Sequence, residues 1–117
     1  MPDEAFDGID SFSHIEIIFS FDKADKTKVV YSGHPRGNPQ WPHTGIFAQR
    51  KKDRPNSLGL TVAVMVKREG RKIWVRNLDA INGTPVLDIK PVIKEFLPQG
   101  EIKQPSWCSE LMKDYWK

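Results

Sequence analysis

The chain has 117 residues, a length that suits one domain with a modest core. Only 38% of its residues are hydrophobic, and no run approaches the roughly 18 apolar residues that cross a membrane. We predict no signal peptide, because the first residues are acidic rather than basic. The single cysteine, Cys108, cannot form an internal disulfide, which together with the absence of an export signal favours the cytoplasm.

Charge is unevenly distributed along the chain. The net charge of +3 is by itself weak support for a nucleic-acid partner. Residues 50–54 carry four cations against one aspartate, residues 67–76 carry five cations against one glutamate, and acidic residues gather in residues 1–25. A domain with one acidic end and two basic loops could offer a surface to a polyanion. The alternative is an ordinary scatter of charge.

The first predicted element is a half-buried strand over residues 14–21, after a loop that fills residues 1–13. Polar and apolar residues alternate in it, so that one face carries Ile15, Ile17, Phe19 and Phe21. A second, short strand is expected at residues 28–32. Residues 33–44 hold three prolines and two glycines and predict a long loop, in which Trp41 either covers a small pocket or caps the core.

Three further strands are predicted over residues 45–49, 58–66 and 72–78. The longest of them alternates, with one face formed by Leu60, Val62, Val64 and Val66 and the other by Thr61, Ala63 and Met65. A hairpin turn at residues 67–71, with Gly70 at a positive φ, joins the last two strands.

The chain ends with an edge segment and a helix. Residues 85–89 predict a short strand, and Pro85, which lacks a backbone donor, suggests a sheet edge. A tail helix is predicted over about residues 106–116, with Ser106 as a candidate N-cap. The helix has an aromatic face that packs on the core or forms a dimer interface, carried by Trp107, Leu111 and Tyr115.

Short strands separated by turn signals predict an all-β fold. We expect a single small β-barrel over residues 1–117, with a short C-terminal helix. His14, His34, His43 and Cys108 do not make a metal constellation, and no Ser-His-Asp order indicates a hydrolase.

Two stretches stand out as motifs. Residues 45–61 read GIFAQRKKDRPNSLGLT, a basic loop between apolar segments that suits an anionic or polar ligand, although a merely solvated hairpin loop is the alternative. Residues 78–91 read LDAINGTPVLDIKP, in which Asn82-Gly83 predicts a tight turn. With GIDSFSH at residues 8–14 and HPRGN at residues 34–38, these motifs resemble the TsaA-like family, also called TrmO-like. The resemblance covers roughly residues 6 to 98.

The resemblance implies a β-barrel enzyme: a methyltransferase that uses S-adenosylmethionine and acts on tRNA. Family members methylate the exocyclic nitrogen of a modified adenosine beside the anticodon and work as homodimers. The alternative is a catalytically weak or inactive binding domain for RNA or a small molecule. No membrane and no metal are expected.

The family motifs also imply a cofactor site. The matching positions are Asp22, Lys23, Arg50, Leu60, Asp79, Ala80, Ile81 and Asn82. Arg50 would bind the methionine carboxylate, and Asp79 would accept from the ribose hydroxyls. Backbone groups at Ala80 and Ile81 would read the adenine while Leu60 packs on its face. Ordinary alternatives are an Arg50–Asp53 ion pair, and turn capping by Asp79 and Asn82.

For RNA, the expected contacts are the remaining cations of the basic loop: Lys51, Lys52 and Arg54. An exposed ion pair between Asp88 and Lys90 is a further possibility that carries no function.

The chain departs from the family pattern at three places. Asp22 stands where many members have histidine, and Ser57 replaces a proline of the basic motif. Family members also begin with a further strand and a loop that supplies cofactor contacts, whereas only 11 residues precede Phe12 here. We therefore expect a truncated form, a site that is completed differently, or a loss of binding.

Overall fold

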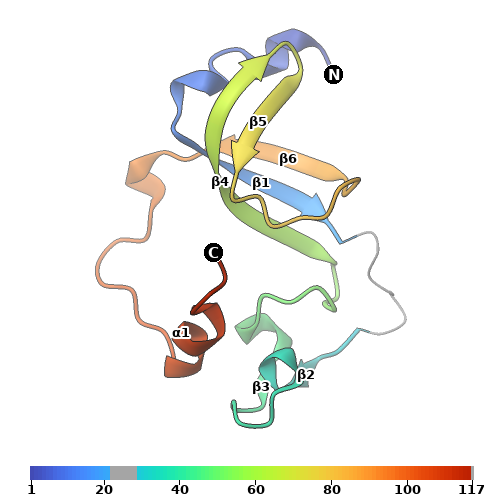
Figure 1. The fold of residues 1–117 in the computed structure, drawn as a ribbon, viewed down its shortest axis with the longest axis vertical. Coiled ribbons are helices and arrows are strands. Elements are labelled where there is room, and N and C mark those ends of the chain that lie inside the picture. Colours follow the sequence, from blue (N-terminus) through green and yellow to red (C-terminus); the bar gives the residue numbers. More distant parts are fainter. Residues whose placement is uncertain (22–28, 117) are drawn as a thin grey trace.

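An antiparallel sheet of four strands organises the molecule (Figure 1). The computed structural model describes residues 1–21 and 29–116. Within them the strands stand in the order β5-β4-β1-β6, with the bounds β1 (His14–Ser20), β4 (Leu58–Glu69), β5 (Lys72–Arg76) and β6 (Val86–Pro91). The prediction of a mostly-sheet fold with a short C-terminal helix is confirmed. No closed barrel is found among these residues, and the barrel stays a prediction.

The core lies on one face of β1 and β4. Side chains of β1 alternate, and Ile15, Ile17 and Phe19 are buried as the pattern predicted. The register places Ile15 beside Ala63 and Ile17 beside Thr61 on this face. The opposite face of β4 is apolar but exposed, and its side chains there are Leu58, Leu60 and Val62.

Phe19 packs across the neighbouring strand at Gly59. The two residues are paired in the register, and a Cβ at Gly59 would lie 2.4 Å from the ring of Phe19. The same ring makes an edge-to-face contact with Phe21, with 5.3 Å between the ring centroids. Gly59 therefore leaves room for an aromatic ring that covers the strand in place of a side chain.

A short ladder and a 3-10 helix follow in the region between β1 and β4: β2 (Ser32–Gly33), β3 (Thr44–Gly45) and η5 (Ile46–Ala48). The prediction of a strand over residues 45–49 is therefore wrong after its first residue. The reason is a pair of backbone hydrogen bonds, because the N–H of Ile46 donates to the carbonyl of the distant Tyr31 and the N–H of Gln49 donates to the carbonyl of Ile46. The strand predicted at 28–32 starts outside the described residues, and within them only its last residue is extended in a ladder.

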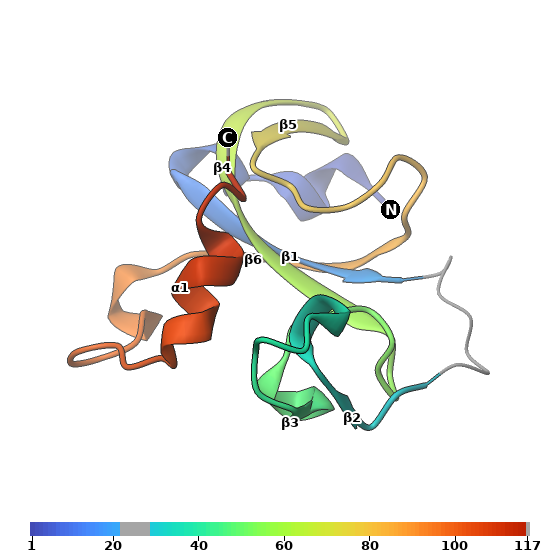
Figure 2. The ribbon, with the colours of Figure 1, turned by 60° about the horizontal axis from the view of Figure 1, so that its bottom comes forward.

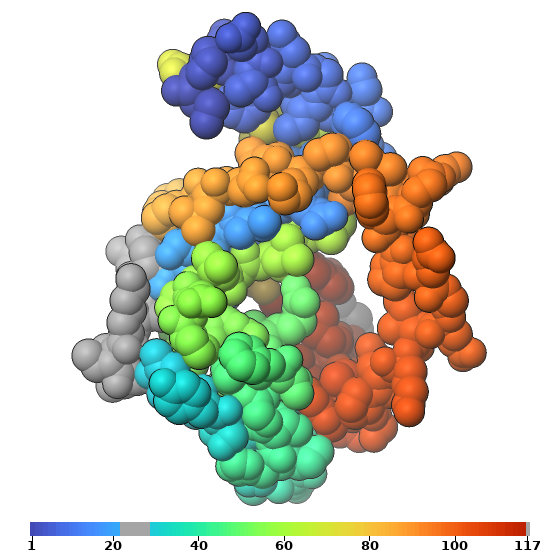
Figure 3. Space-filling view, turned by 180° about the vertical axis from the view of Figure 1, so that it is seen from behind, coloured from blue at the N-terminus to red at the C-terminus, as the bar shows by residue number. Residues whose placement is uncertain are grey.

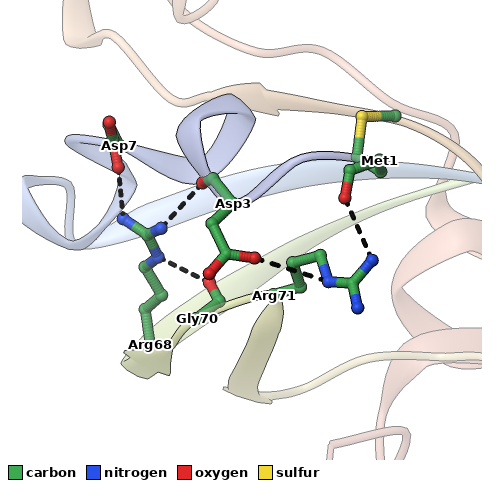
Figure 4. A network of polar contacts seen from close by, with 6 residues as sticks. All are labelled: Met1, Asp3, Asp7, Arg68, Gly70 and Arg71. Atoms are coloured by element: carbon green, nitrogen blue, oxygen red, sulfur yellow. Dashed lines mark hydrogen bonds and ion pairs between the residues drawn. The ribbon is translucent and has the colours of Figure 1, made fainter.

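The acidic N-terminus folds back onto the turn between β4 and β5 (Figure 4). Residues 1–13, predicted as loop, contain η1 (Asp3–Phe6) and η2 (Ile9–Ser11). The Arg68 guanidinium donates to the Asp7 carboxylate at 3.0 Å and to the backbone carbonyl of Asp3 at 2.8 Å. Arg71 lies 3.4 Å from the Asp3 carboxylate. The acidic end therefore covers part of the second basic loop, which is less available to a polyanion than its charge suggested.

The turn between β4 and β5 is tighter than predicted. β4 continues to Glu69, so only Gly70 and Arg71 form the turn, with Gly70 at φ +59° as expected. The ammonium group of Lys67 lies 4.3 Å from the Trp74 ring centroid and 3.3 Å from the Glu69 carboxylate. The contact with Trp74 joins β4 to β5, whereas the contact with Glu69 lies within β4, so Lys67 belongs to the ladder rather than to a loop.

The C-terminal helix, α1 (Ser106–Met112), is reached by a long connection from the sheet (Figure 2). Pro105 is its N-cap, so the prediction of Ser106 as N-cap is wrong; Ser106 is already helical, and no side chain caps the helix. The helix ends before the predicted residue 116 and continues as turns. The indole Nε1 of Trp41 donates to the Glu110 carboxylate at 2.7 Å, which connects the long proline-containing loop to α1.

Candidate functional site

A cavity of about 890 Å³ opens between the exposed face of β4, the basic loop and α1. Its volume is near the upper end of the roughly 300–1,000 Å³ that is typical of small-molecule sites. Seen from behind, the molecule is hollowed between its tail, drawn orange to red, and the green segments that include β4 (Figure 3). Most of the lining comes from residues 47–62, 79–84 and 107–116.

Arg54 holds the basic loop in shape from inside. Its guanidinium donates to the carbonyl oxygens of Gln49 at 2.7 Å, Lys51 at 3.0 Å and Ile46 at 3.3 Å. The Ile46 carbonyl also accepts the backbone N–H of Gln49, so this one side chain adds to the loop's own backbone hydrogen bonding and satisfies two further carbonyl groups, those of Gln49 and Lys51. The predicted RNA contact at Arg54 stays untested, but this residue is already engaged within the loop.

Gln49 fastens the same loop to the β2–β3 ladder. It is only 6% exposed, and its Nε2 donates to the carbonyl oxygens of Gly33 at 3.0 Å and Thr44 at 3.2 Å. Its Oε1 is buried without a hydrogen-bond partner among the described residues. Gln49 also lines the cavity, although this oxygen atom is itself buried.

Ser57 closes the basic loop in a left-handed conformation. It is buried at φ +51°, and its carbonyl accepts the N–H of Phe21 at 2.8 Å. The family motif has proline here, and a proline ring fixes φ near −65°. Serine at this position therefore allows a φ angle that proline could not adopt.

Arg50, Lys51 and Lys52 all line the cavity. The Arg50 guanidinium donates to the carbonyl oxygen of Leu60 on β4 at 3.0 Å. The alternative ion pair with Asp53 does not form within the described part of the chain. The charge of Arg50 therefore remains available to a ligand, and its position is fixed by the strand.

The turn after β5 brings Asp79, Ala80 and Ile81 to the cavity, whereas Asn82 does not line it. β5 ends at Arg76, earlier than predicted, because Asn77 takes φ +64° and leaves the ladder. Backbone bonding closes the turn that follows, as the N–H of Thr84 donates to the carbonyl of Ile81 at 3.1 Å. Among residues 1–21 and 29–116, no hydrogen bond uses the carboxylate of Asp79, so turn capping does not account for it.

The exposed ion pair expected between Asp88 and Lys90 is present at 3.1 Å. The hydrogen bond from Lys90, and then the backbone N–H of Ile89, lower the pKa of the Asp88 carboxyl. Neither residue lines the cavity, which agrees with a role outside the site.

Sequence reasoning missed one wall of the cavity. This wall consists of the aromatic and apolar face of α1 and the turns after it: Trp107, Leu111, Met112, Tyr115 and Trp116. Their spacing was visible in the sequence, but it indicated only an apolar face and not what that face meets. Arg36 and Phe47 line the cavity as well; both lie in motifs that carry the family resemblance, but neither was predicted as a site residue.

Five of the eight predicted cofactor positions line the cavity: Arg50, Leu60, Asp79, Ala80 and Ile81. Asp22 and Lys23 lie outside the described residues. All three cations predicted for RNA share the same cavity. In the part of the chain that the structure covers, no three His, Cys, Asp or Glu residues cluster as a metal site would require. None of the helices described here is both long and apolar enough to span a membrane.

Comparison with known proteins identifies related sequences. Residues 1–96 match the sequence profile of the tRNA-methyltransferase O N-terminal domain. A human tRNA (adenine(37)-N6)-methyltransferase is 41% identical over 108 residues, which cover 89% of this chain and 23% of the human protein. A probable S-adenosyl-L-methionine-binding protein of Pyrococcus abyssi is 36% identical over 93 residues, covering 80% of this chain and 48% of that protein.

Solved structures agree with the sequence comparison. A crystal structure of TrmO from Pseudomonas aeruginosa superposes with a TM-score of 0.68 and 28% identity, over 89% of this chain and 41% of that chain. A second one gives a TM-score of 0.62 and 29% identity, over 87% and 43%. The chain thus spans about a quarter of the length of the human relative and less than half of each of the others.

Proposed function

Because the chain belongs to the family of tRNA-methyltransferase O N-terminal domains, we propose that it is a methyltransferase that uses S-adenosylmethionine and acts on tRNA. The proposed methyl acceptor is the exocyclic nitrogen of a modified adenosine near the anticodon. The observation that carries the proposal is the single cavity in which Arg50, Leu60 and the turn from Asp79 to Ile81 meet.

The chemistry of these groups fits the cofactor. S-adenosylmethionine carries a carboxylate, ribose hydroxyls and a flat adenine, and when bound it supplies an electrophilic methyl group. Arg50 offers a fixed cation, Asp79 offers an unused carboxylate, and Leu60 offers an apolar surface. The protein's contribution is to bind the two reactants and orient them in one cavity.

Charge supports an RNA substrate. Among the described residues, the cavity lining includes five cations, Arg36, Arg50, Lys51, Lys52 and Arg54, and one carboxylate, that of Asp79. We assign phosphate contacts to Lys51 and Lys52, which the loop's internal hydrogen bonds leave free at their ammonium groups within the described residues.

We also propose that residues 1–117 form one domain that assembles as a cytoplasmic homodimer and completes a barrel. The accessible surface is 8993 Å², against roughly 6,500 Å² for a compact monomer of this mass. The radius of gyration is 16.3 Å, where about 13 Å is usual. This extra surface, much of it apolar, supports a second copy as its cover.

A calorimetric titration with S-adenosylmethionine tests the proposal. We expect saturable binding, and Arg50→Ala should weaken it by about 1.5–3 kcal/mol, roughly ten- to over a hundredfold. Arg71→Ala is the matched control and should leave the affinity unchanged, because within the described residues the polar contacts of this arginine are to Met1 and Asp3 and it does not line the cavity. Mass spectrometry of tRNA incubated with protein and cofactor should then find a methylated adenosine. No binding at millimolar cofactor by folded protein would refute the enzyme and leave an RNA- or ligand-binding domain.

A further inference from the structure

The two walls of the cavity differ in composition. The wall formed by β4 and the turn after β5 is aliphatic, with Leu60, Val62 and Ile81. The wall formed by α1 and the turns after it is aromatic, with Trp107, Tyr115 and Trp116. Aromatic rings offer flat surfaces that suit flat ligands, whereas aliphatic side chains pack on any shape. The cavity is therefore equipped for more than one kind of group.

The aromatic wall is not part of the core. No residue of α1 is buried, and Trp116, just beyond it, is 55% exposed. An exposed aromatic surface that faces a cavity is available to a ligand rather than used for packing. The exposed ring of Trp116 is therefore free to pack against a ligand in the cavity.

The wall is nevertheless held in a defined position. Glu110 accepts the hydrogen bond from Trp41, and the Arg36 guanidinium lies 6.0 Å from the Tyr115 ring centroid. Tyr115 and Trp116 contact each other edge-to-face at 5.0 Å between centroids. That contact uses at most one face of the Trp116 ring, because an edge-to-face pair engages one edge and one face.

The charge of the cavity identifies the ligand class. The five cations and one carboxylate that the described residues bring to the lining favour an anionic ligand. Cations beside aromatic rings are the combination that binds single-stranded nucleic acid. The volume of about 890 Å³ has room for a cofactor on one wall and a second planar group on the other.

We propose that the aromatic wall of α1 and its following turns is the stacking surface for the RNA adenine that accepts the methyl group, with Trp116 as the ring that stacks on it. The proposal rests on the proposed function, in which the cofactor lies against Leu60 and the turn after β5. A base that undergoes chemistry must leave its stack, and a protein ring replaces the stacking that it loses. The two reactants then enter one cavity from opposite walls.

The test is a set of RNA-binding titrations on the full chain. The probes are an anticodon stem-loop RNA with the modified adenosine at the target position and the same RNA with an abasic ribose there. Trp116→Ala should weaken binding of the adenosine RNA about 5- to 150-fold, as about 1–3 kcal/mol per stacked base predicts. The affinities of the wild-type protein and of Trp116→Ala for the abasic RNA should agree within twofold. Trp116→Phe should recover most of the loss, because it restores an aromatic face.

Two controls make the outcome specific. Trp74→Ala removes a tryptophan of β5 that lies outside the cavity, and it should leave RNA binding unchanged. Titration of Trp116→Ala with S-adenosylmethionine should give the wild-type affinity. Three results for Trp116→Ala would overturn the stacking role while the proposed enzyme stands. They are a loss of cofactor binding, an equal loss of affinity for both RNAs, and an unchanged affinity for both RNAs. Wild-type protein that binds neither cofactor nor RNA would refute both.

Discussion

The contact between Gly59 and Phe19 gives a prediction about the stability of the wall that bears the site. A Cβ at residue 59 would meet three ring atoms of Phe19, the nearest at 2.4 Å and the next at 2.5 Å. An ordinary contact starts near 3.4 Å, so the ring would have to move by about 1 Å. The ring is 2% exposed and braced by Phe21, which leaves it little room to move.

Gly59→Ala should therefore destabilise the fold by about 1–3 kcal/mol, the usual cost of overpacking a buried site. For a domain of this size, each kcal/mol lowers Tm by roughly 3–6 °C. Gly45→Ala is the matched control, since its φ is −68° and nothing lies closer than the Tyr31 carbonyl at 4.0 Å. It should be neutral or stabilising by up to about 1 kcal/mol.

A double-mutant cycle tests whether the ring is the cause. The free energy of unfolding in urea is measured for the wild-type protein, Gly59→Ala, Phe19→Leu and the double variant. If the ring is responsible, the cost of Gly59→Ala should shrink in a Phe19→Leu background, giving a coupling energy of about 0.5–3 kcal/mol. An equal cost in both backgrounds would show that the ring contact is not the reason, and a wild-type Tm for Gly59→Ala would refute the argument altogether.

Three further predictions follow from the charges and the open surface. Arg68→Ala should cost about 1.5–3 kcal/mol and speed hydrogen exchange in the N-terminal residues, whereas Arg71→Ala, more exposed, should cost about 0–1 kcal/mol; equal effects would contradict the network. Charge reversal of Lys51 and Lys52 should weaken tRNA binding and flatten its salt dependence by a log–log slope of roughly 0.7 per lost phosphate contact on single strands, and an unchanged slope in filter-binding assays would exclude them. Light scattering at tens of micromolar protein should give the mass of a dimer, and the mass of a monomer would contradict the proposed homodimer.

The elements that could be predicted are those whose signal is local. The alternation of β1 fixes its buried face, and the motif that starts at residue 45 marked the loop that lines the cavity. Gly70 was also predicted correctly, because a two-residue turn needs a positive φ. In these cases one short stretch of sequence contains the whole physical cause.

What escaped prediction depends on partners far apart in the chain. The basic residue Arg68 was expected in an exposed loop, but its partners are the Asp3 carbonyl and the Asp7 carboxylate. The residues from Ile46 to Ala48 read as a strand, but hydrogen bonds to Tyr31 and from Gln49 bend them into a 3-10 turn. The spacing of the tail helix indicated an apolar face, and only the fold brings that face to the cavity.

The open cavity also makes the stability of this fold depend on what fills it. Leu58, Leu60 and Val62 stay exposed on β4, so apolar area that a closed core would bury does not contribute to the stability of the fold. A ligand that binds only the folded state adds RT ln(1 + [L]/Kd), about 2.7 kcal/mol at a hundredfold excess over Kd. That gain is a large share of the roughly 5–15 kcal/mol that holds a typical domain together. A cavity wall whose apolar side chains stay exposed is thus incompletely packed, and binding and folding depend on the same surface.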